Sequence, residues 1–252
     1  MSNSGVQPNG LPTPALVAND EELADDLAAC ALDLARRFAA GATMWCVAPL
    51  WPEQARHVAV EFVHPVIVGK RALPAVSIDA VDPVGALRAI ATRGDVVVVI
   101  GDAATKAAPP LLLRASAWGL MSVWIGAGER PPAGSADHVL WIDAVVAGAA
   151  RHDGSVVRLY HQLWELTHVC FEHAGLFEAV QAPGAGEVCT TCADEGRPAE
   201  VLSVDDRDSA SVRTSVGVET VDTTIVAPVQ VGDLLLVHAG TAIAVVQEDH
   251  RE

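Results

Sequence analysis

Val96-Val97-Val98-Val99-Ile100 is the stretch that decides the fold of the larger part of this chain. Five consecutive apolar, β-branched residues predict a strand that is buried on both faces, as in a parallel sheet covered by helices. Other short apolar runs occupy residues 43–47, 75–78, 121–125 and 139–142. Helical patterns alternate with these runs, at residues 20–41, 52–63, 83–92, 110–118 and 156–173. This alternation predicts a doubly wound α/β domain over residues 19–176.

The pattern changes after a small-residue linker, which we place at residues 177–188. Short β-branched segments separated by turn residues follow, at residues 200–204, 211–216, 219–226, 234–238 and 242–247. No helix-length pattern occurs among them. We therefore predict a small all-β, OB-like barrel of five strands over residues 189–252. Residues 1–18 are expected to form a flexible leader.

The charge balance narrows the class of partner. The chain carries 16 basic and 32 acidic residues, for a net charge of -16, and has no cluster of Lys and Arg that would bind a phosphate backbone. From Glu187 onward there are 13 acidic and 4 basic residues, which favours a basic protein partner. No apolar run approaches the roughly 18 residues of a membrane span. The N-terminus has no secretory-signal pattern. We expect neither nucleic acid nor membrane as a partner, and a cytoplasmic location.

Two cysteines stand apart from the other three. Cys189 and Cys192 lie close together in a polar stretch, whereas Cys30, Cys46 and Cys170 fall in apolar segments and are expected in the core. Thiolates at the Cys-x-x-Cys spacing either bind one soft metal or form a redox disulfide, and two incidental thiols are the alternative. No second pair is present to complete a four-ligand zinc site.

The run Val231-Gly232-Asp233-Leu234-Leu235-Leu236-Val237-His238-Ala239-Gly240 resembles the signature of the hydrogenase-assembly chaperone family (HypC/HupF). Taken alone, His238 would be a hydrogen-bonded histidine at a strand end. The resemblance covers about residues 187–252 and implies a barrel that carries an iron-cyanide-carbonyl unit toward the large-subunit precursor of nickel-iron hydrogenase. It also implies a second partner, an iron-sulfur maturation protein. The family cysteine and the His of the His-Ala-Gly run are the implied iron ligands.

The cysteine departs from the family pattern. In the family it directly follows the initiator Met, whereas Cys192 is internal and five residues separate it from Pro198. Ala199 stands where the family prefers glycine. We take Cys192 as the family cysteine because it lies nearer Pro198, with Cys189 as a candidate second thiolate and His238 as the third ligand. Thiolates suit iron that bears cyanide and carbonyl, because that iron is a soft centre.

Residues 20–176 resemble the SIS (sugar isomerase) family, in particular its sedoheptulose-7-phosphate isomerase branch. His57 and Glu61 match that branch's His-x-x-x-Glu helix, and His161 falls where the family has another metal-site histidine. An i, i+4 pair puts both side chains on one helical face. The resemblance implies a metal site, with zinc as the expected ion. The alternative is a polar helix face with hydrogen-bonded histidines.

The loop that would bind phosphate in this family lacks most of its hydroxyl donors here. Gly101-Asp102-Ala103-Ala104-Thr105-Lys106-Ala107 offers one hydroxyl, on Thr105, and places the Asp102 carboxylate where a phosphate would bind. Lys106 compensates in part. We expect sugar-phosphate isomerisation to be lost and the domain to serve docking or homo-oligomer formation. An aldose-ketose isomerase that uses His57, Glu61 and His161, or a phosphosugar-binding protein, is the alternative.

Overall fold

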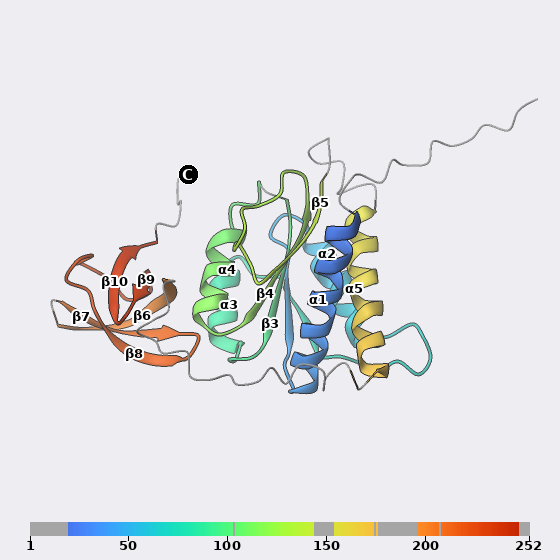
Figure 1. Cartoon of the computed structure of the whole chain (residues 1–252), viewed down its shortest axis with the longest axis horizontal. Helices are drawn as coiled ribbons and strands as arrows, with labels where there is room; N and C mark the ends of the chain where they lie inside the picture. Colours follow the sequence, from blue (N-terminus) through green and yellow to red (C-terminus); the bar gives the residue numbers. More distant parts are fainter. Residues whose placement is uncertain are drawn as a thin grey trace, which may run out of the picture.

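The computed structural model describes residues 20–102, 104–143, 154–173, 175, 196–206 and 208–246. The predicted leader, the predicted linker, Cys189 and Cys192 lie outside these residues. The described residues form a parallel α/β unit and a small barrel that packs against one side of it (Figure 1). Both predicted architectures are confirmed.

Five parallel strands make the central sheet, in the order β2-β1-β3-β4-β5. The strands are β1 (Met44–Val47), β2 (Ala75–Ile78), β3 (Val96–Ile100), β4 (Met121–Ala127) and β5 (His138–Ile142). All five residues of β3 are fully buried, as its unbroken apolar run predicted. The chain adds β2 on one side of β1 and β3 on the other, so the strand order reverses between β1 and β3. Open sheets of this kind bind ligands at such a reversal, beside the carboxyl ends of the strands.

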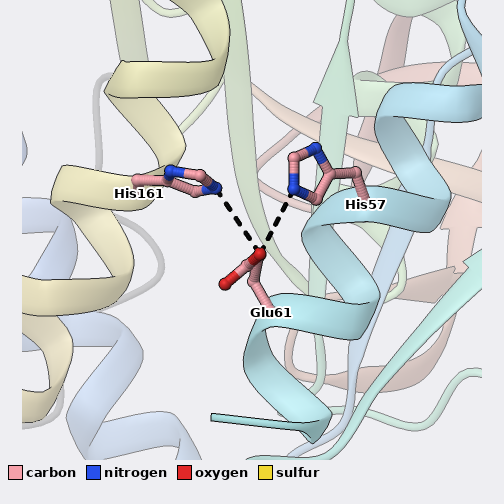
Figure 2. Close-up of side chains that lie close together, drawn as sticks. All are labelled: His57, Glu61 and His161. Atoms are coloured by element: carbon pink, nitrogen blue, oxygen red, sulfur yellow. Dashed lines mark hydrogen bonds and ion pairs between the residues drawn. The ribbon is translucent and has the colours of Figure 1, made fainter. Parts of the chain in front are cut away.

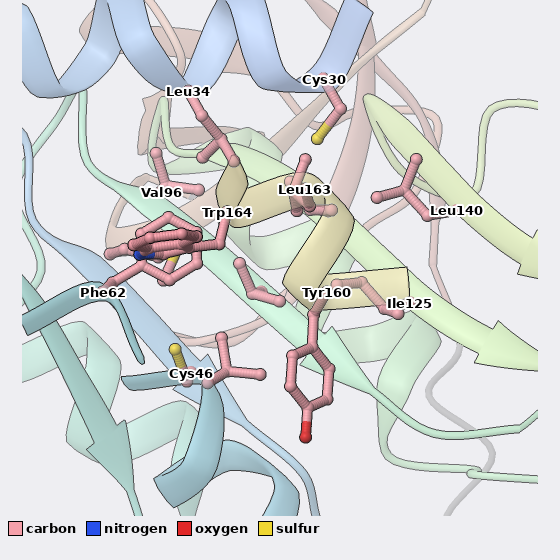
Figure 3. Packing of buried hydrophobic residues seen from close by; sticks show 14 of the residues in the cluster. Cys30, Leu34, Cys46, Phe62, Val96, Ile125, Leu140, Tyr160, Leu163 and Trp164 are labelled. Carbon is pink, nitrogen blue, oxygen red and sulfur yellow. The ribbon is translucent and has the colours of Figure 1, made fainter. Parts of the chain in front are cut away.

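Helices cover both faces of the sheet. The helices are α1 (Asp20–Ala39), α2 (Pro52–Val63), α3 (Pro83–Ile90), α4 (Ala108–Ala117) and α5 (Ser155–Glu172). Helices α1, α2 and α5 share one apolar core with the sheet, which includes Cys30, Cys46 and Cys170 as expected. Helices α3 and α4 share the other core. The side chains of Tyr160, Leu163 and Trp164 on α5 pack in the first core (Figure 3).

The C-terminal strands close into a barrel in the order β10-β8-β7-β6-β9. They are β6 (Arg197–Asp206), β7 (Ser209–Thr214), β8 (Gly217–Asp222), β9 (Leu234–His238) and β10 (Thr241–Val245). Alternate residues of these strands fill a small core, including Val201, Val212, Leu235 and Val237. With a core this small, packing against a larger domain adds stability that the barrel alone would lack.

The predicted boundaries of two barrel strands were wrong. Residues 211–216 and 219–226 were expected as strands with Gly217 as the joint, but β8 begins at Gly217 itself and ends at Asp222. The strand ends there because the Asp222 carboxylate accepts hydrogen bonds from the Thr224 amide and hydroxyl, which turns the chain. Thr223, Ile225 and Val226 look like strand residues by type, yet they follow this side-chain cap.

The barrel and the α/β unit share one buried interface. Leu234 of β9 belongs to the same apolar cluster as Trp118 and the residues of α4. Contacts between α4 and β6 dominate this boundary. Among the described residues, no helix combines the length and apolar character needed to cross a bilayer.

Candidate functional site

His238 sits at the start of a tight hairpin. It is the last residue of β9 and pairs with Thr241, the first residue of β10. The two residues between them have positive φ angles, 49° for Ala239 and 81° for Gly240, as in a type I′ turn. Leu235 and Val237 point into the barrel core. Because side chains alternate along a strand, His238 lies on the outer face and is half-buried.

The first barrel strand begins beside this histidine. Arg197 of β6 pairs with Val237 of β9, and continuing this antiparallel register by one residue puts Gly196 opposite His238. The backbone at Gly196 lies close to β9, since a Cβ atom there would be 2.7 Å from the Leu236 Cγ. Strand β6 therefore begins at the end of the barrel that carries His238.

The α/β unit brings together three residues that the sequence had singled out, His57, Glu61 and His161. His57 and Glu61 lie one turn apart on α2, and His161 faces them from α5 (Figure 2). The Glu61 Oε1 is 3.2 Å from the His57 Nε2 and 3.6 Å from the His161 Nε2. One ligand atom from each residue lies within 4.8 Å of the other two. Two imidazoles and one carboxylate suit a zinc ion that keeps a coordination position open.

A tyrosine and a glutamine stand behind His57. The Tyr160 hydroxyl donates to the Gln54 Oε1 at 2.9 Å and lies 2.7 Å from the His57 Nδ1. Burial, and secondarily the nearby Glu61 carboxylate, raise the pKa of the Tyr160 hydroxyl well above its usual range, so it stays protonated. Neither residue was predicted from the sequence. A usable signal existed for one of them, because Tyr160 is the only tyrosine of the chain and directly precedes His161.

The loop after β3 is closed by its own carboxylate. The Asp102 Oδ1 accepts hydrogen bonds from the Ala104 amide and from the Thr105 hydroxyl, both at 3.1 Å. Thr105 is buried and Lys106 is exposed. An amide and a hydroxyl at this position are the donors that a phosphate would use, so Asp102 occupies the place of the anion.

Helix α4, which follows this loop, is a poor anion site for a second reason. Its second and third residues are Pro109 and Pro110, which have no backbone N–H. The start of a helix binds anions through free N–H groups. The Pro109-Pro110 pair is a sequence signal for this property of α4.

The two groups of candidate residues lie on opposite sides of the sheet. His57, Glu61 and His161 belong to helices α2 and α5, whereas the barrel with His238 packs beside α3 and α4 (Figure 1). The sheet separates them, so they are independent sites.

A buried carboxylate holds the barrel in place. Glu200 of β6 accepts hydrogen bonds from Arg114 Nη1 at 2.9 Å, Arg88 Nε at 3.0 Å and Trp118 Nε1 at 2.7 Å. The same Arg114 nitrogen also donates to the carbonyl of Gly232, at the turn before β9. This cluster was not predicted, because nothing in the sequence pairs residues of α4 with residues of β6.

Comparisons with known proteins match the two parts separately. The family model described as the HupF/HypC family matches residues 196–252. The structure of a phosphoheptose isomerase from Francisella tularensis is 13% identical, covers 59% of this chain and 90% of its own, and gives a TM-score of 0.50. A phosphoheptose isomerase from Neisseria gonorrhoeae is 16% identical, covers 58% of this chain and 86% of its own, and gives 0.45. No curated protein sequence matches the chain. At 13% identity the likeness to the Francisella tularensis structure shows the fold of the α/β unit alone, and it confirms that part of the sequence prediction.

Proposed function

We propose that this chain is a hydrogenase-maturation chaperone, because residues 196–252 match the HupF/HypC family model and the α/β unit has the fold seen in a phosphoheptose isomerase. In this role the barrel holds or delivers an iron-cyanide-carbonyl unit, and it docks the large-subunit precursor of nickel-iron hydrogenase. Cys192, Cys189 and His238 are the proposed ligands of the iron. The α/β unit serves docking or oligomer formation.

One observation carries the proposal: β6 begins beside His238. Arg197 pairs with Val237, so the chain reaches the barrel at the His238 end. Cys192 precedes Gly196 by four residues, a stretch that spans at most about 14 Å. A stretch of this length is long enough to bring the Cys192 thiolate to the His238 imidazole.

The ligand chemistry also fits a delivery role. Cysteine thiolates are soft ligands, and imidazole is a common ligand of iron. One or two thiolates and one imidazole leave coordination positions for cyanide and carbonyl. Because few protein ligands hold the metal, another protein can take it over. A closed site with four protein ligands would resist such a transfer.

Single substitutions test the proposal in cells whose hydrogenase maturation depends on this chain. We expect Cys192→Ala to abolish hydrogenase activity and His238→Ala to lower it strongly, with the circular dichroism spectrum of each purified variant unchanged. Cys189→Ala tests the candidate second thiolate separately, because it removes the neighbouring thiol of the same stretch. Unchanged hydrogenase activity in Cys192→Ala would contradict the proposed role of that thiolate.

Infrared spectroscopy supplies the direct measurement. Protein purified without oxygen should show cyanide and carbon monoxide stretching bands together with bound iron, and Cys192→Ala should lose both. A scaffold that binds only proteins would carry neither. That result would remove the iron unit from the proposal while leaving docking in place.

We propose a second function for the α/β unit, supported by the cluster of His57, Glu61 and His161: it binds a divalent metal, with zinc as the expected ion. The side chains of the two histidines are 41% and 45% exposed, so an ion can reach them from solvent. The carboxylate that closes the 101–107 loop weighs against the isomerase alternative. Turnover of a heptose phosphate that Glu61→Gln abolishes would favour the isomerase instead.

A further inference from the structure

We infer that Gln54 and Tyr160 are positioning residues that keep the proton of neutral His57 on Nδ1, so that its Nε2 presents a lone pair to a divalent cation held with Glu61 and His161. This inference rests on the metal site proposed above. It adds the two residues that decide which nitrogen of His57 is able to bind.

The order of donors and acceptors carries the argument. The side-chain oxygen of Gln54 can only accept, so the Tyr160 hydroxyl uses its single hydrogen to donate to it, at 2.9 Å. The hydroxyl oxygen then has only lone pairs to offer to His57, whose Nδ1 is 2.7 Å away. Nδ1 must therefore carry the hydrogen and donate. In a neutral imidazole the other nitrogen, Nε2, is then without a hydrogen.

The surroundings of the unprotonated His57 Nε2 favour a bound cation. The His57 Nε2 lies 3.2 Å from the Glu61 Oε1. Without a proton or an ion between them, this contact sets a lone pair against a carboxylate oxygen. A divalent ion bound to both atoms, and to the His161 Nε2 at 3.6 Å from the same oxygen, turns the repulsion into coordination. Metal-bound histidines commonly hold their second nitrogen in a hydrogen bond of this type.

The hydrogen bonds that link Gln54, Tyr160 and His57 are held rigidly because the Tyr160 side chain is packed in the core. Its side chain is fully buried within the cluster that α5 shares with the sheet, while its hydroxyl reaches toward α2. The His57 ring makes edge contacts with the rings of Tyr160 and His161, at centroid distances of 5.4 and 5.2 Å. Tyr160 thus fixes the orientation of the His57 ring as well as its tautomer.

Nuclear magnetic resonance tests the tautomer on the full chain without metal. In protein labelled with ¹⁵N at histidine, the His57 signals should show the hydrogen on Nδ1. In Tyr160→Phe they should shift toward the form with the hydrogen on Nε2, which then donates to Glu61. Phenylalanine preserves the buried ring, so this variant isolates the hydroxyl. Finding the hydrogen on Nε2 in the unaltered chain would overturn the inference.

Zinc titration, with Zn²⁺ alone as the probe, tests the consequence for metal binding. We expect Tyr160→Phe and Gln54→Leu to weaken zinc affinity about 10- to 100-fold. Gln54→Glu should retain it, because a carboxylate still accepts from the hydroxyl. Glu61→Ala, which removes a ligand, sets the level expected for a lost site. Since the chain has one tyrosine, 3-fluorotyrosine labelling gives a single ¹⁹F signal that should move on zinc addition.

The two proposals fail in distinguishable ways. If the unaltered chain binds no more zinc than Glu61→Ala, the metal site itself is wrong, and the inference falls with it. If the unaltered chain binds zinc and Tyr160→Phe binds it equally well, the metal site stands and the positioning role of Tyr160 is overturned.

Discussion

The carboxylate of Glu200 accepts a hydrogen bond from the indole Nε1 of Trp118, at 2.7 Å, across the boundary between the barrel and the α/β unit. Arg114 donates both to this carboxylate and to the carbonyl of Gly232. These bonds hold β6 and the turn before β9 at the end of the two strands opposite His238, since Glu200 pairs with Leu234 and Arg197 pairs with Val237. The α/β unit therefore presents the barrel in one fixed orientation.

Removing the Glu200 carboxylate should release the barrel. Its side chain is only 2% exposed, so Glu200→Ala leaves the Arg114 guanidinium buried without this partner, which typically costs about 3 kcal/mol. All six tryptophans precede residue 165, so tryptophan fluorescence follows the α/β unit. We expect a red shift of the emission as Trp118 becomes exposed, and faster cleavage between the two parts in limited proteolysis.

A surface ion pair supplies the control for this variant. Asp79 pairs with Arg56, and its side chain is 56% exposed. Asp79→Ala should change the free energy of unfolding by less than about 1 kcal/mol, with no red shift. Equal effects of the two substitutions would show that the Glu200 cluster does not hold the barrel.

Asp102→Ser should create a weak phosphate site. In the unaltered chain the Ala104 amide and the Thr105 hydroxyl donate to the Asp102 carboxylate. The substitution removes this carboxylate and its negative charge. Because Pro109 and Pro110 deprive α4 of two N–H donors, we expect a Kd for inorganic phosphate no tighter than about 1 mM. ³¹P line broadening measures it. Adding Lys106→Ala to this variant should weaken binding further, whereas the unaltered chain should show none. Binding by the unaltered chain would contradict the closed-loop interpretation.

Native protein without bound iron should expose two reactive thiols out of five. Burial raises the pKa of the Cys30, Cys46 and Cys170 thiols, so they remain protonated and unreactive near pH 8. Cys189 and Cys192 are expected to react because their sequence surroundings are polar. Alkylation counted by mass spectrometry should give two rapid modifications in the native state and five after unfolding. Rapid alkylation of Cys46 in the native state would contradict the prediction.

The same buried thiols predict a pH dependence of stability. The folded chain keeps protons on Cys30 and Cys46 at pH values where the unfolded chain, with an ordinary thiol pKa of 9.0, has released them. The unfolded state then binds fewer protons, so the free energy of unfolding falls as pH rises through about 9. Urea denaturation at a series of pH values measures the slope. Cys46→Ala should reduce it.

Much of the fold could be predicted because its signals are local. The β3 run predicted a buried strand, and its five residues are that strand. The resemblance to the SIS family pointed to His57 and Glu61, and their i, i+4 spacing placed both on one face of α2. The end of β8 did not, because the side-chain cap by Asp222 outweighs the strand preference of the residues that follow.

The unpredicted contacts join distant parts of the chain. The Tyr160 hydroxyl meets Gln54 across 106 positions, and Arg114 meets Glu200 across 86. Residue type gives no hint of such partners, because one glutamine or glutamate resembles any other until the fold has brought its neighbour near. Asp102 is an intermediate case: the sequence showed an unsuitable charge, and the structure added that this charge already holds the donors of the loop.

Position 239, in the hairpin next to His238, should tolerate only residues that adopt a left-handed backbone conformation. Ala239 has a φ of 49° in the two-residue turn between β9 and β10. Ala239→Asn should be neutral or stabilising because Asn-Gly is favoured in such turns, whereas Ala239→Val should be destabilising because a β-branched residue adopts a positive φ less readily than alanine does. Urea denaturation ranks the variants. If the hairpin also aligns His238 for iron, Ala239→Val should lower iron retention and Ala239→Asn should not. Equal stability of the two variants would contradict the turn geometry.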